Sequence, residues 1–256
     1  MKAVEGPAGA YQELRCLHQG DGRAAFLCLS LRDNCLVVVK RLWLRGVAAR
    51  ERAELLREAE ILQALDHPHI IRFRDCFLAG DCLCLVMDYA DGGDLQQRLR
   101  AAEAPLAEAQ VLEWFVQLCL ALRHVHERRV VHRDVKCSNV FLTAAGAVKL
   151  GDFGVSSRLG GDDWLRTFAG TYMYLSPEIL AGQPYNAQTD LWSLGVVLYE
   201  LCARRPPFEA PRNDRRELAA RRVHMPVTGT AIADLRALGD RRVGADDLVH
   251  GIAREA

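Results

Sequence analysis

The sequence predicts an α+β fold of two lobes: a small, antiparallel β-rich lobe with one helix, followed by a larger, mostly helical lobe. Short apolar runs separated by turn residues fill the first third of the chain, and long helical stripes dominate the rest. A polar Asp-Gly-Gly-Asp break at 91–94 separates the two patterns. We expect a flexible N-terminus at 1–10 and one domain at 11–256, with an N-lobe at 11–87, a hinge at 88–94 and a C-lobe at 95–256.

The pattern of the first lobe is that of strands connected by tight turns. Asp33-Asn34, between two apolar runs, is typical of such a turn, as is Asp21-Gly22. Leucines at helical spacing predict an amphipathic helix that ends before His67-Pro68. We expect strands at 24–29, 35–39, 70–77 and 82–87 and the helix at 50–65.

The pattern of the second lobe is helical. Asp94 is placed to cap a first helix, and Pro105 opens a long helix that runs to about His126 with a continuous apolar stripe. The segment 190–201 is apolar nearly all round, which is typical of a buried helix. Two short strands are expected at 140–142 and 148–150.

The composition excludes several classes of protein. A formal net charge of zero gives no reason to expect nucleic acid or an anionic membrane surface as a partner. The start of the chain lacks the apolar run of a secretory signal, and the longest apolar stretch, 191–203, is too short to span a bilayer. Nine cysteines without a signal predict free thiols in a reducing compartment. We expect the cytoplasm, with the nucleus or the cytoskeleton as alternatives.

Two short motifs carry the chemistry. The segment 132–139 reads His-Arg-Asp-Val-Lys-Cys-Ser-Asn, and the segment 152–154 reads Asp-Phe-Gly. Together they set two carboxylates, one ammonium and one carboxamide on two loops separated by a predicted strand pair. Such a set suits the transfer of a phosphoryl group with magnesium, because one acid serves the acceptor hydroxyl and the others serve metal and charge.

Lysine is scarce in this chain, which makes the few lysines informative. Only four of the 33 basic residues are lysine, namely Lys2, Lys40, Lys136 and Lys149. A lysine supplies a compact point charge where the planar fork of arginine will not serve. Lys40, at the end of an apolar run, and Lys136, inside the first motif, are therefore candidates for phosphate contacts.

The order and spacing of the motifs resemble the catalytic loop and the metal-binding loop of eukaryotic protein kinases. Within that superfamily the chain is most similar to the NIMA-related serine/threonine kinases, over about 11–210. The phrases that carry this similarity are Met-Asp-Tyr at 87–89, Asp-Gly-Gly-Asp-Leu at 91–95, Tyr-Leu-Ser-Pro-Glu at 174–178, Pro-Tyr-Asn at 184–186, Thr-Asp-Leu-Trp at 189–192, Leu-Tyr-Glu-Leu at 198–201 and Phe-Glu-Ala at 208–210. The resemblance implies a bilobal kinase fold that uses ATP and Mg²⁺.

The resemblance implies a role for each polar residue of the two motifs. Asp134 would accept and orient the substrate hydroxyl as the base, and Lys136 would offset charge on the transferred phosphoryl group. Asn139 and Asp152 would hold magnesium. Thr171 would bridge Asp134 and Lys136. Lys136 also favours serine or threonine over tyrosine as the acceptor.

The resemblance also places the nucleotide. Lys40 would contact the phosphates, oriented by Glu58 on the predicted helix, with Glu54 second and Glu60 also open. The glycine turn would bring backbone amides to the phosphates, and Met87 would control access to the back of the pocket. The nucleotide-binding candidates are Gly20, Gly22, Leu27, Val38, Lys40, Met87, Asp88, Ala90, Asp94, Phe141 and Asp152.

Regulation and completeness are further expectations. Arg133, beside the predicted base, needs an anion, and a phosphate on Thr167 would supply one, with Ser156, Ser157 and Thr171 as alternatives. After residue 210 the resemblance thins, and the end of the C-lobe is shorter than in the family by about two helical turns.

Three hypotheses follow from these expectations. The first is an active serine/threonine kinase with ATP and protein substrates as partners, which the presence of every required side chain favours. The second is a pseudokinase or scaffold module, and the third a truncated, inactive kinase fragment. The sequence predicts no nucleic acid and no membrane partner, and it does not predict an oligomeric state.

Overall fold

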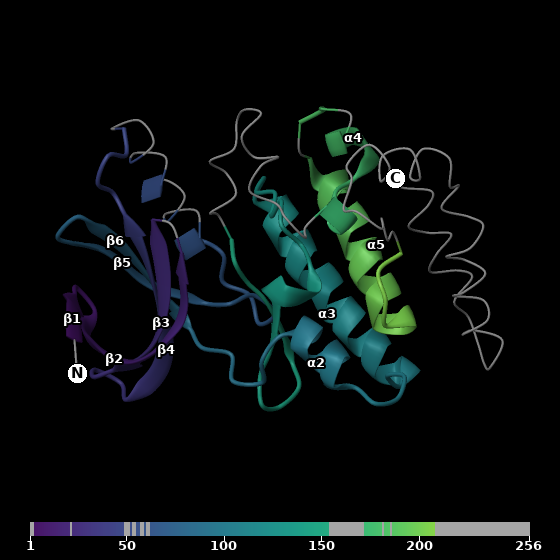
Figure 1. Cartoon of the computed structure of the whole chain (residues 1–256), viewed down its shortest axis with the longest axis horizontal. Coiled ribbons are helices and arrows are strands. Elements are labelled where there is room, and N and C mark those ends of the chain that lie inside the picture. The colour runs from purple at the N-terminus through teal and green to yellow at the C-terminus, as the bar shows by residue number, and fades with distance from the viewer. Residues whose placement is uncertain are drawn as a thin grey trace. The chain divides into compact units, whose positions relative to one another are not determined.

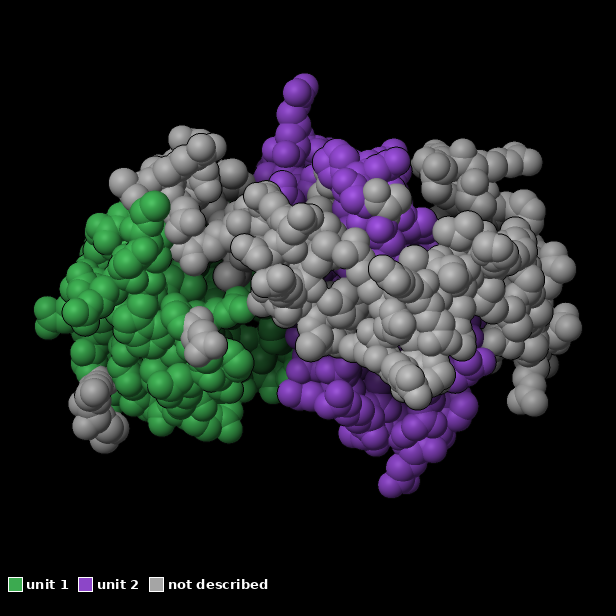
Figure 2. Space-filling view, turned by 45° about the horizontal axis from the view of Figure 1, so that its top comes forward, with its two compact units in different colours: residues 1–93, 141–155 green, residues 94–140, 156–256 purple. Residues whose placement is uncertain are grey.

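The structure of the chain is a computed structural model. It describes residues 3–20, 22–48, 52, 55–56, 59, 62–153, 172–180, 182–184 and 186–207. The chain divides into two compact units, Met1–Gly93 with Phe141–Val155 and Asp94–Val140 with Ser156–Ala256 (Figure 2). The first unit contains most of the described strands and the second contains the long helices.

A six-stranded antiparallel sheet forms most of the first unit (Figure 1). Its order is β1-β2-β3-β4-β6-β5. The strands are β1 (Ala3–Gly6), β2 (Gly9–Gly20), β3 (Arg23–Ser30), β4 (Cys35–Trp43), β5 (Phe73–Ala79) and β6 (Cys82–Asp88). Gly22, Asn34 and Gly80 take positive φ at the hairpin turns, where glycine and asparagine are tolerated best. The turn predicted at 33–34 is confirmed.

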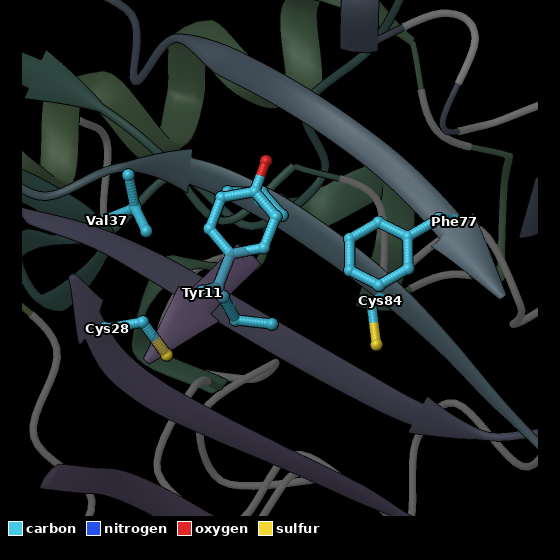
Figure 3. Close-up of a cluster of buried hydrophobic side chains, with 7 residues drawn as sticks. Tyr11, Cys28, Val37, Phe77 and Cys84 are labelled. Carbon is cyan, nitrogen blue, oxygen red and sulfur yellow. The ribbon is translucent and has the colours of Figure 1, made fainter. Parts of the chain in front are cut away.

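One face of the sheet covers the first hydrophobic core. Because side chains alternate along a strand, Val37 and Val39 of β4 point to the same side, and both are fully buried. Tyr11 and Phe77 stack with their ring centroids 5.9 Å apart (Figure 3). The buried residues of this core are Tyr11, Cys28, Val37, Val39, Phe77, Cys84 and Val86.

The opposite face of the sheet covers a second core and carries Lys40. Described residues of the predicted helix at 50–65, namely 52, 55–56, 59 and 62–63, are helical. The second core consists of Leu42, Leu44, Leu55, Ala59, Leu83 and Leu85. Lys40 lies two residues before Leu42 on β4, so it projects from this same face.

The first strand shows that the prediction of a flexible N-terminus at 1–10 is wrong for residues 3–10. β1 pairs with β2, with Val4 opposite Tyr11, and Val4 packs against the first core. A Cβ at Gly6 would overlap the ring of Phe77, so the backbone of β1 lies directly on that ring. The composition of residues 3–10 did not indicate this strand, because its close contact with Phe77 depends on a glycine, which has no side chain.

A strand pair joins the hinge within the first unit. β7 (Val140–Leu142) and β8 (Val148–Leu150) form a two-stranded sheet, at the residues predicted for them. Gly92 N donates to Leu142 O, and Leu142 N donates to Gly93 O, both at 2.8 Å. A Cβ at Gly92 would lie 2.6 Å from the carbonyl oxygen of Thr143, so glycine is required for this approach.

The second unit consists of helices. Its elements are α2 (Leu95–Ala101), α3 (Glu108–Glu127), η1 (Cys137–Asn139), η4 (Tyr172–Tyr174), α4 (Pro177–Leu180) and α5 (Ala187–Ala203). α3 and α5 pack side by side (Figure 1). Asp94 caps α2 as predicted, with Oδ1 accepting from Gln97 N at 2.8 Å. α3 begins three residues after Pro105, and α5 begins before residue 190.

A capping box explains the earlier start of α5. The side chain of Asn186 accepts from Thr189 N at 3.1 Å, while Thr189 Oγ1 accepts from Asn186 N at 3.2 Å. The predicted α+β class, with a β-rich lobe and a helical region, is confirmed. None of the described helices has the length and apolar character needed to cross a membrane.

Candidate active site

A buried carboxylate at the start of α5 holds the backbone of the predicted catalytic loop, residues 132–139. Asp190 is 1% exposed and accepts from the backbone N–H groups of His132 at 2.8 Å and Arg133 at 2.9 Å. Its Oδ2 also lies 2.8 Å from Nε2 of His126 on α3. Three partners satisfy a carboxylate that would otherwise be costly to bury. They also hold Arg133 at a φ of 70°, a backbone conformation that is strained for arginine.

Asp134 is fixed by two side chains of its own loop. Lys136 Nζ donates to Asp134 Oδ2 at 2.7 Å, and Asn139 Nδ2 donates to the same oxygen at 2.8 Å and to the backbone carbonyl of Asp134 at 2.8 Å. The other carboxylate oxygen, Oδ1, is buried and accepts no hydrogen bond from any described residue. A buried acceptor left unsatisfied is costly. Asp134 Oδ1 therefore has the capacity to accept a further hydrogen bond.

Glu200 of α5 ties the catalytic loop to the segment before α4. Cys137 Sγ donates to Glu200 Oε2 at 3.2 Å, and the hydroxyl of Tyr174 donates to the same oxygen. Burial raises the pKa of Glu200, although both hydrogen bonds act in the opposite direction. Burial also raises the pKa of Tyr174, and it raises the pKa of Cys137 well above its usual value. Cys137 is thus a neutral packing thiol rather than a reactive one.

Lys40 and Asp152 form an ion pair in the first unit. Lys40 Nζ donates to Asp152 Oδ1, and the two side chains are 24% and 36% exposed. An ion pair this open to solvent contributes little to stability, so its value lies in positioning. Asp152 has a φ of 61°, in the left-handed region that a carboxylate residue adopts at some cost. The predicted partner Glu58 lies outside the described residues, so the Lys40–Glu58 pair stays a prediction.

Three nucleotide-site candidates form one apolar row across three strands. Leu27 lies opposite Val38, and Val38 lies opposite Met87. Directly opposite residues project to the same face of a sheet, and this is the face of Lys40. All three are half-buried, whereas Val37 and Val39 on the other face are fully buried. The row therefore offers an apolar surface beside the ammonium, as an adenine ring requires.

The hinge supplies backbone groups next to this row. Asp88 N donates to Arg72 O at 2.9 Å, and the Asp88 carboxylate accepts from Arg74, so the side chain of Asp88 is held away from a nucleotide role. Ala90 is buried, and its backbone takes no hydrogen bond from a described residue. Such groups suit the polar edge of a base.

Phe141 and the glycine turn are also located in the first unit. A Cβ at Gly151 would lie 2.9 Å from the Phe141 ring, so β7 and the residue after β8 pack closely around it. Gly20 lies opposite Arg23 where β2 and β3 meet, and Gly22 has a φ of 70°. One carboxylate oxygen of Asp94 accepts the hydrogen bond that caps α2. The nucleotide contacts of all these residues stay predictions.

A small apolar hollow of the first unit is lined by Met87. Asp152 is the one charged residue in its lining. The lining residues are Leu62, Leu65, Ile70, Ile71, Phe73, Met87, Asp152 and Phe153. That Met87 controls access to the back of a nucleotide pocket stays a prediction.

Several predicted residues lie outside the described part of the chain. They are Glu54, Glu58, Glu60, Ser156, Ser157, Thr167 and Thr171. The predicted shortening of the C-lobe likewise falls in 208–256, beyond the described residues.

The oxygen donors fit magnesium by chemical type. The amide nitrogen of Asn139 is engaged with Asp134, so its carbonyl oxygen is the atom with which it would bind a cation. Asp152, in the first unit, carries a carboxylate of the type that binds magnesium. The described residues contain no cluster of three or more His, Cys, Asp or Glu suited to a metal. Magnesium at a nucleotide needs no such cluster, because phosphates and waters complete its shell.

Three contacts of this site were missed from the sequence. His126 binds Asp190, and Glu200 joins Cys137 to Tyr174. The signal was present in α5, because a carboxylate on a helix that is apolar nearly all round must find buried partners. The nine cysteines, all in the described part of the chain, are free as predicted.

Known proteins are similar to this chain over most of its length. Residues 11–250 match the protein kinase domain family. The chain is 44% identical over 202 residues to serine/threonine-protein kinase Nek1 of Mus musculus, an alignment that covers 78% of this chain and 17% of that protein. It is 41% identical over 202 residues to Nek5 of Homo sapiens (78% and 28%) and 36% identical over 259 residues to Nek4 of Mus musculus (97% and 32%). The chain spans less than a third of the length of these relatives.

Proposed function

Because this chain belongs to the protein kinase family, we propose that it transfers the γ-phosphoryl group of ATP to serine or threonine hydroxyls of proteins. The observation that carries this proposal is the state of Asp134. One of its oxygens is held by Lys136 and Asn139, and the other is buried without a hydrogen bond from a described residue. A substrate hydroxyl would complete that environment.

Asp134 would act as the base of the reaction. The acceptor hydroxyl donates to Asp134 Oδ1, and its proton passes to this oxygen as the new O–P bond forms and ADP departs. Lys136 Nζ, 2.7 Å from Oδ2, keeps the carboxylate oriented and brings positive charge to the transferred group. Asp190 keeps the backbone of this loop rigid, which such positioning requires.

The first unit would bind the nucleotide. The half-buried row of Leu27, Val38 and Met87 would cover the adenine, and Lys40 would contact the phosphates. Magnesium held by Asn139 and Asp152 would offset phosphate charge. The Lys40–Asp152 ion pair supports these roles, because it keeps an ammonium and a carboxylate ready for phosphate and cation.

We also propose a reducing compartment, the cytoplasm, for this activity. Nine free cysteines, several of them buried, fit such an environment.

Phosphorylation of Thr167 stays a proposal, and phosphopeptide mapping of active protein tests it. We expect to find the peptide phosphorylated at Thr167. Active protein that is unmodified at Thr167 would contradict the proposal.

Transfer of labelled phosphate from ATP to generic acceptor proteins tests the proposed function. We expect Lys40→Met to lower the transfer rate by about a hundredfold or more, because the ammonium that meets the phosphates is lost. Lys149→Met is the matched control, since Lys149 on β8 takes no part in the site, and it should retain the rate of the wild type. Acid hydrolysis of the product should give phosphoserine or phosphothreonine.

The same assay separates the rival hypotheses. A wild-type protein that melts cooperatively and is stabilised by Mg-ATP, but transfers no more phosphate than Lys40→Met, is a pseudokinase or scaffold module. A protein without a cooperative melt is an incomplete fragment. Either result contradicts the proposed function.

A further inference from the structure

The nucleotide face of the sheet carries an imidazole to which the proposed function gives no role. His18 of β2 lies opposite Ala25 of β3, and Ala25 lies opposite Lys40 of β4. Directly opposite residues project to the same face, so His18 and Lys40 share one row of the sheet. Neighbouring strands are about 4.8 Å apart, which places the two Cα atoms about 10 Å from each other. Only the methyl group of Ala25 stands between their side chains.

The ring of His18 lies against the predicted phosphate-binding turn. A Cβ built on Gly20 would lie 3.2 Å from His18 Nε2 and 3.8 Å from its Cε1. The imidazole therefore occupies the space that a side chain at position 20 would take. His18 is exposed, so a ligand that reaches the turn also reaches the ring.

The charges around this row favour an anion. Arg23 lies opposite Gly20, and Arg15 lies opposite Leu27, so each flanking row adds a guanidinium to the same face. Asp152, paired with Lys40, is the opposing charge there. A bound phosphate chain would thus meet several cationic groups and one carboxylate that prefers a metal ion.

We infer that His18 is a further nucleotide-contacting residue, whose ring N–H donates to a phosphate oxygen of ATP lying over Ala25 between His18 and Lys40. This inference rests on the proposed function. The small side chain of Ala25 leaves room for the phosphate, and a hydrogen bond to a charged oxygen is among the stronger kinds. Adenosine, which has no phosphates, gains nothing from His18.

Dissociation constants for Mg-ATP and for adenosine, measured by calorimetry, test the inference. We expect His18→Ala to weaken Mg-ATP binding about tenfold or more, the order expected for one hydrogen bond to a charged group, and to leave adenosine binding within about twofold. His18→Lys should restore ATP binding, because its ammonium N–H groups can donate to the same phosphate oxygen. Gln19→Ala is the matched control, since Gln19 lies opposite Ala24 on the other face of the sheet, and it should change neither constant.

The possible outcomes separate this inference from the proposed function. Equal Mg-ATP affinity in the wild type and in His18→Ala overturns the inference alone. An equal loss of ATP and adenosine affinity also overturns it, because a purely structural role predicts that result. A wild-type protein that binds no nucleotide overturns the proposed function and this inference with it.

Discussion

Three acidic residues of the second unit differ in their hydrogen-bond partners. Asp190 is saturated by two backbone amides and an imidazole, so it serves as an anchor. Glu200 shares one oxygen between a thiol and a phenol. Asp134 keeps one oxygen without a hydrogen bond from a described residue. The different partners, rather than the residue type, distinguish the structural acids from the proposed base.

The raised pKa of Glu200 predicts a pH-dependent effect of its removal. The folded protein retains a proton that the unfolded chain loses near the ordinary value of 4.5. The stabilisation that this retained proton gives the folded protein is fully present below about pH 4.5. It is lost as the pH rises through the pKa of Glu200 in the folded protein. Glu200→Gln keeps the hydrogen-bonding oxygen but does not ionise. Its melting temperature relative to wild type should therefore be higher at pH 8 than at pH 5, by about 3 °C.

Thermal melts across pH 5 to 8 check this expectation. Glu127→Gln is the control, because Glu127 is 62% exposed and lies at the end of α3. Its melting temperature should follow that of the wild type at every pH. If the Glu200→Gln difference does not change with pH, Glu200 is ionised in the folded protein and the account of this cluster is wrong.

At the scale of elements, the first strand is held by a contact that the sequence pattern did not predict. Gly6 lies on the ring of Phe77, which stacks on Tyr11 in the first core. We expect Gly6→Ala to lower the free energy of unfolding by ~1–3 kcal/mol, because the added methyl group forces the ring or the strand to move. Chemical denaturation measures this difference. Glu5→Ala, an exposed change on the same strand, should stay within about 0.5 kcal/mol.

A Gly6→Ala variant as stable as the wild type would mean that β1 is not seated on the core. The consequence would reach further than one residue, since β1 also contacts β5. Such a result would return residues 3–10 to the flexible tail that the sequence predicted.

Elements with strong local signals were predictable from the sequence. The strands at 140–142 and 148–150 and the cap at Asp94 lie where their apolar alternation and their capping side chain indicated. β1 and the start of α5 were not predicted well. β1 depends on a glycine packed against a distant ring, and α5 begins at an Asn186–Thr189 capping box that differs from the commoner Ser/Thr and Glu pair.

The site was predictable to the extent that its chemistry lies in short motifs. The Lys136 and Asn139 contacts of Asp134 come from one loop, so the motif places them together. His126 lies 64 residues from Asp190, and Cys137 lies 63 residues from Glu200, so tertiary packing alone brings each pair into contact. The Lys40–Asp152 pair, 112 residues apart, was not predicted, because the family resemblance assigned both residues to the nucleotide but paired Lys40 with Glu58.

At the scale of the whole molecule, each unit carries a different part of the proposed phosphotransfer site. The first unit holds an apolar row beside an ammonium and a carboxylate, and the second holds a rigid loop with a poised acid. The account therefore requires that both parts act on one nucleotide and one acceptor hydroxyl.

Single-turnover transfer of phosphate from Mg-ATP by wild type and by Asp134→Asn tests this central claim most directly. The amide can replace the hydrogen-bonding geometry around Lys136 and Asn139 only in part, and it does not accept a proton at neutral pH. The account predicts a rate about a thousandfold lower in the variant, with ATP still bound and the cooperative melt intact. A folded Asp134→Asn protein that transfers phosphate at the wild-type rate would contradict it.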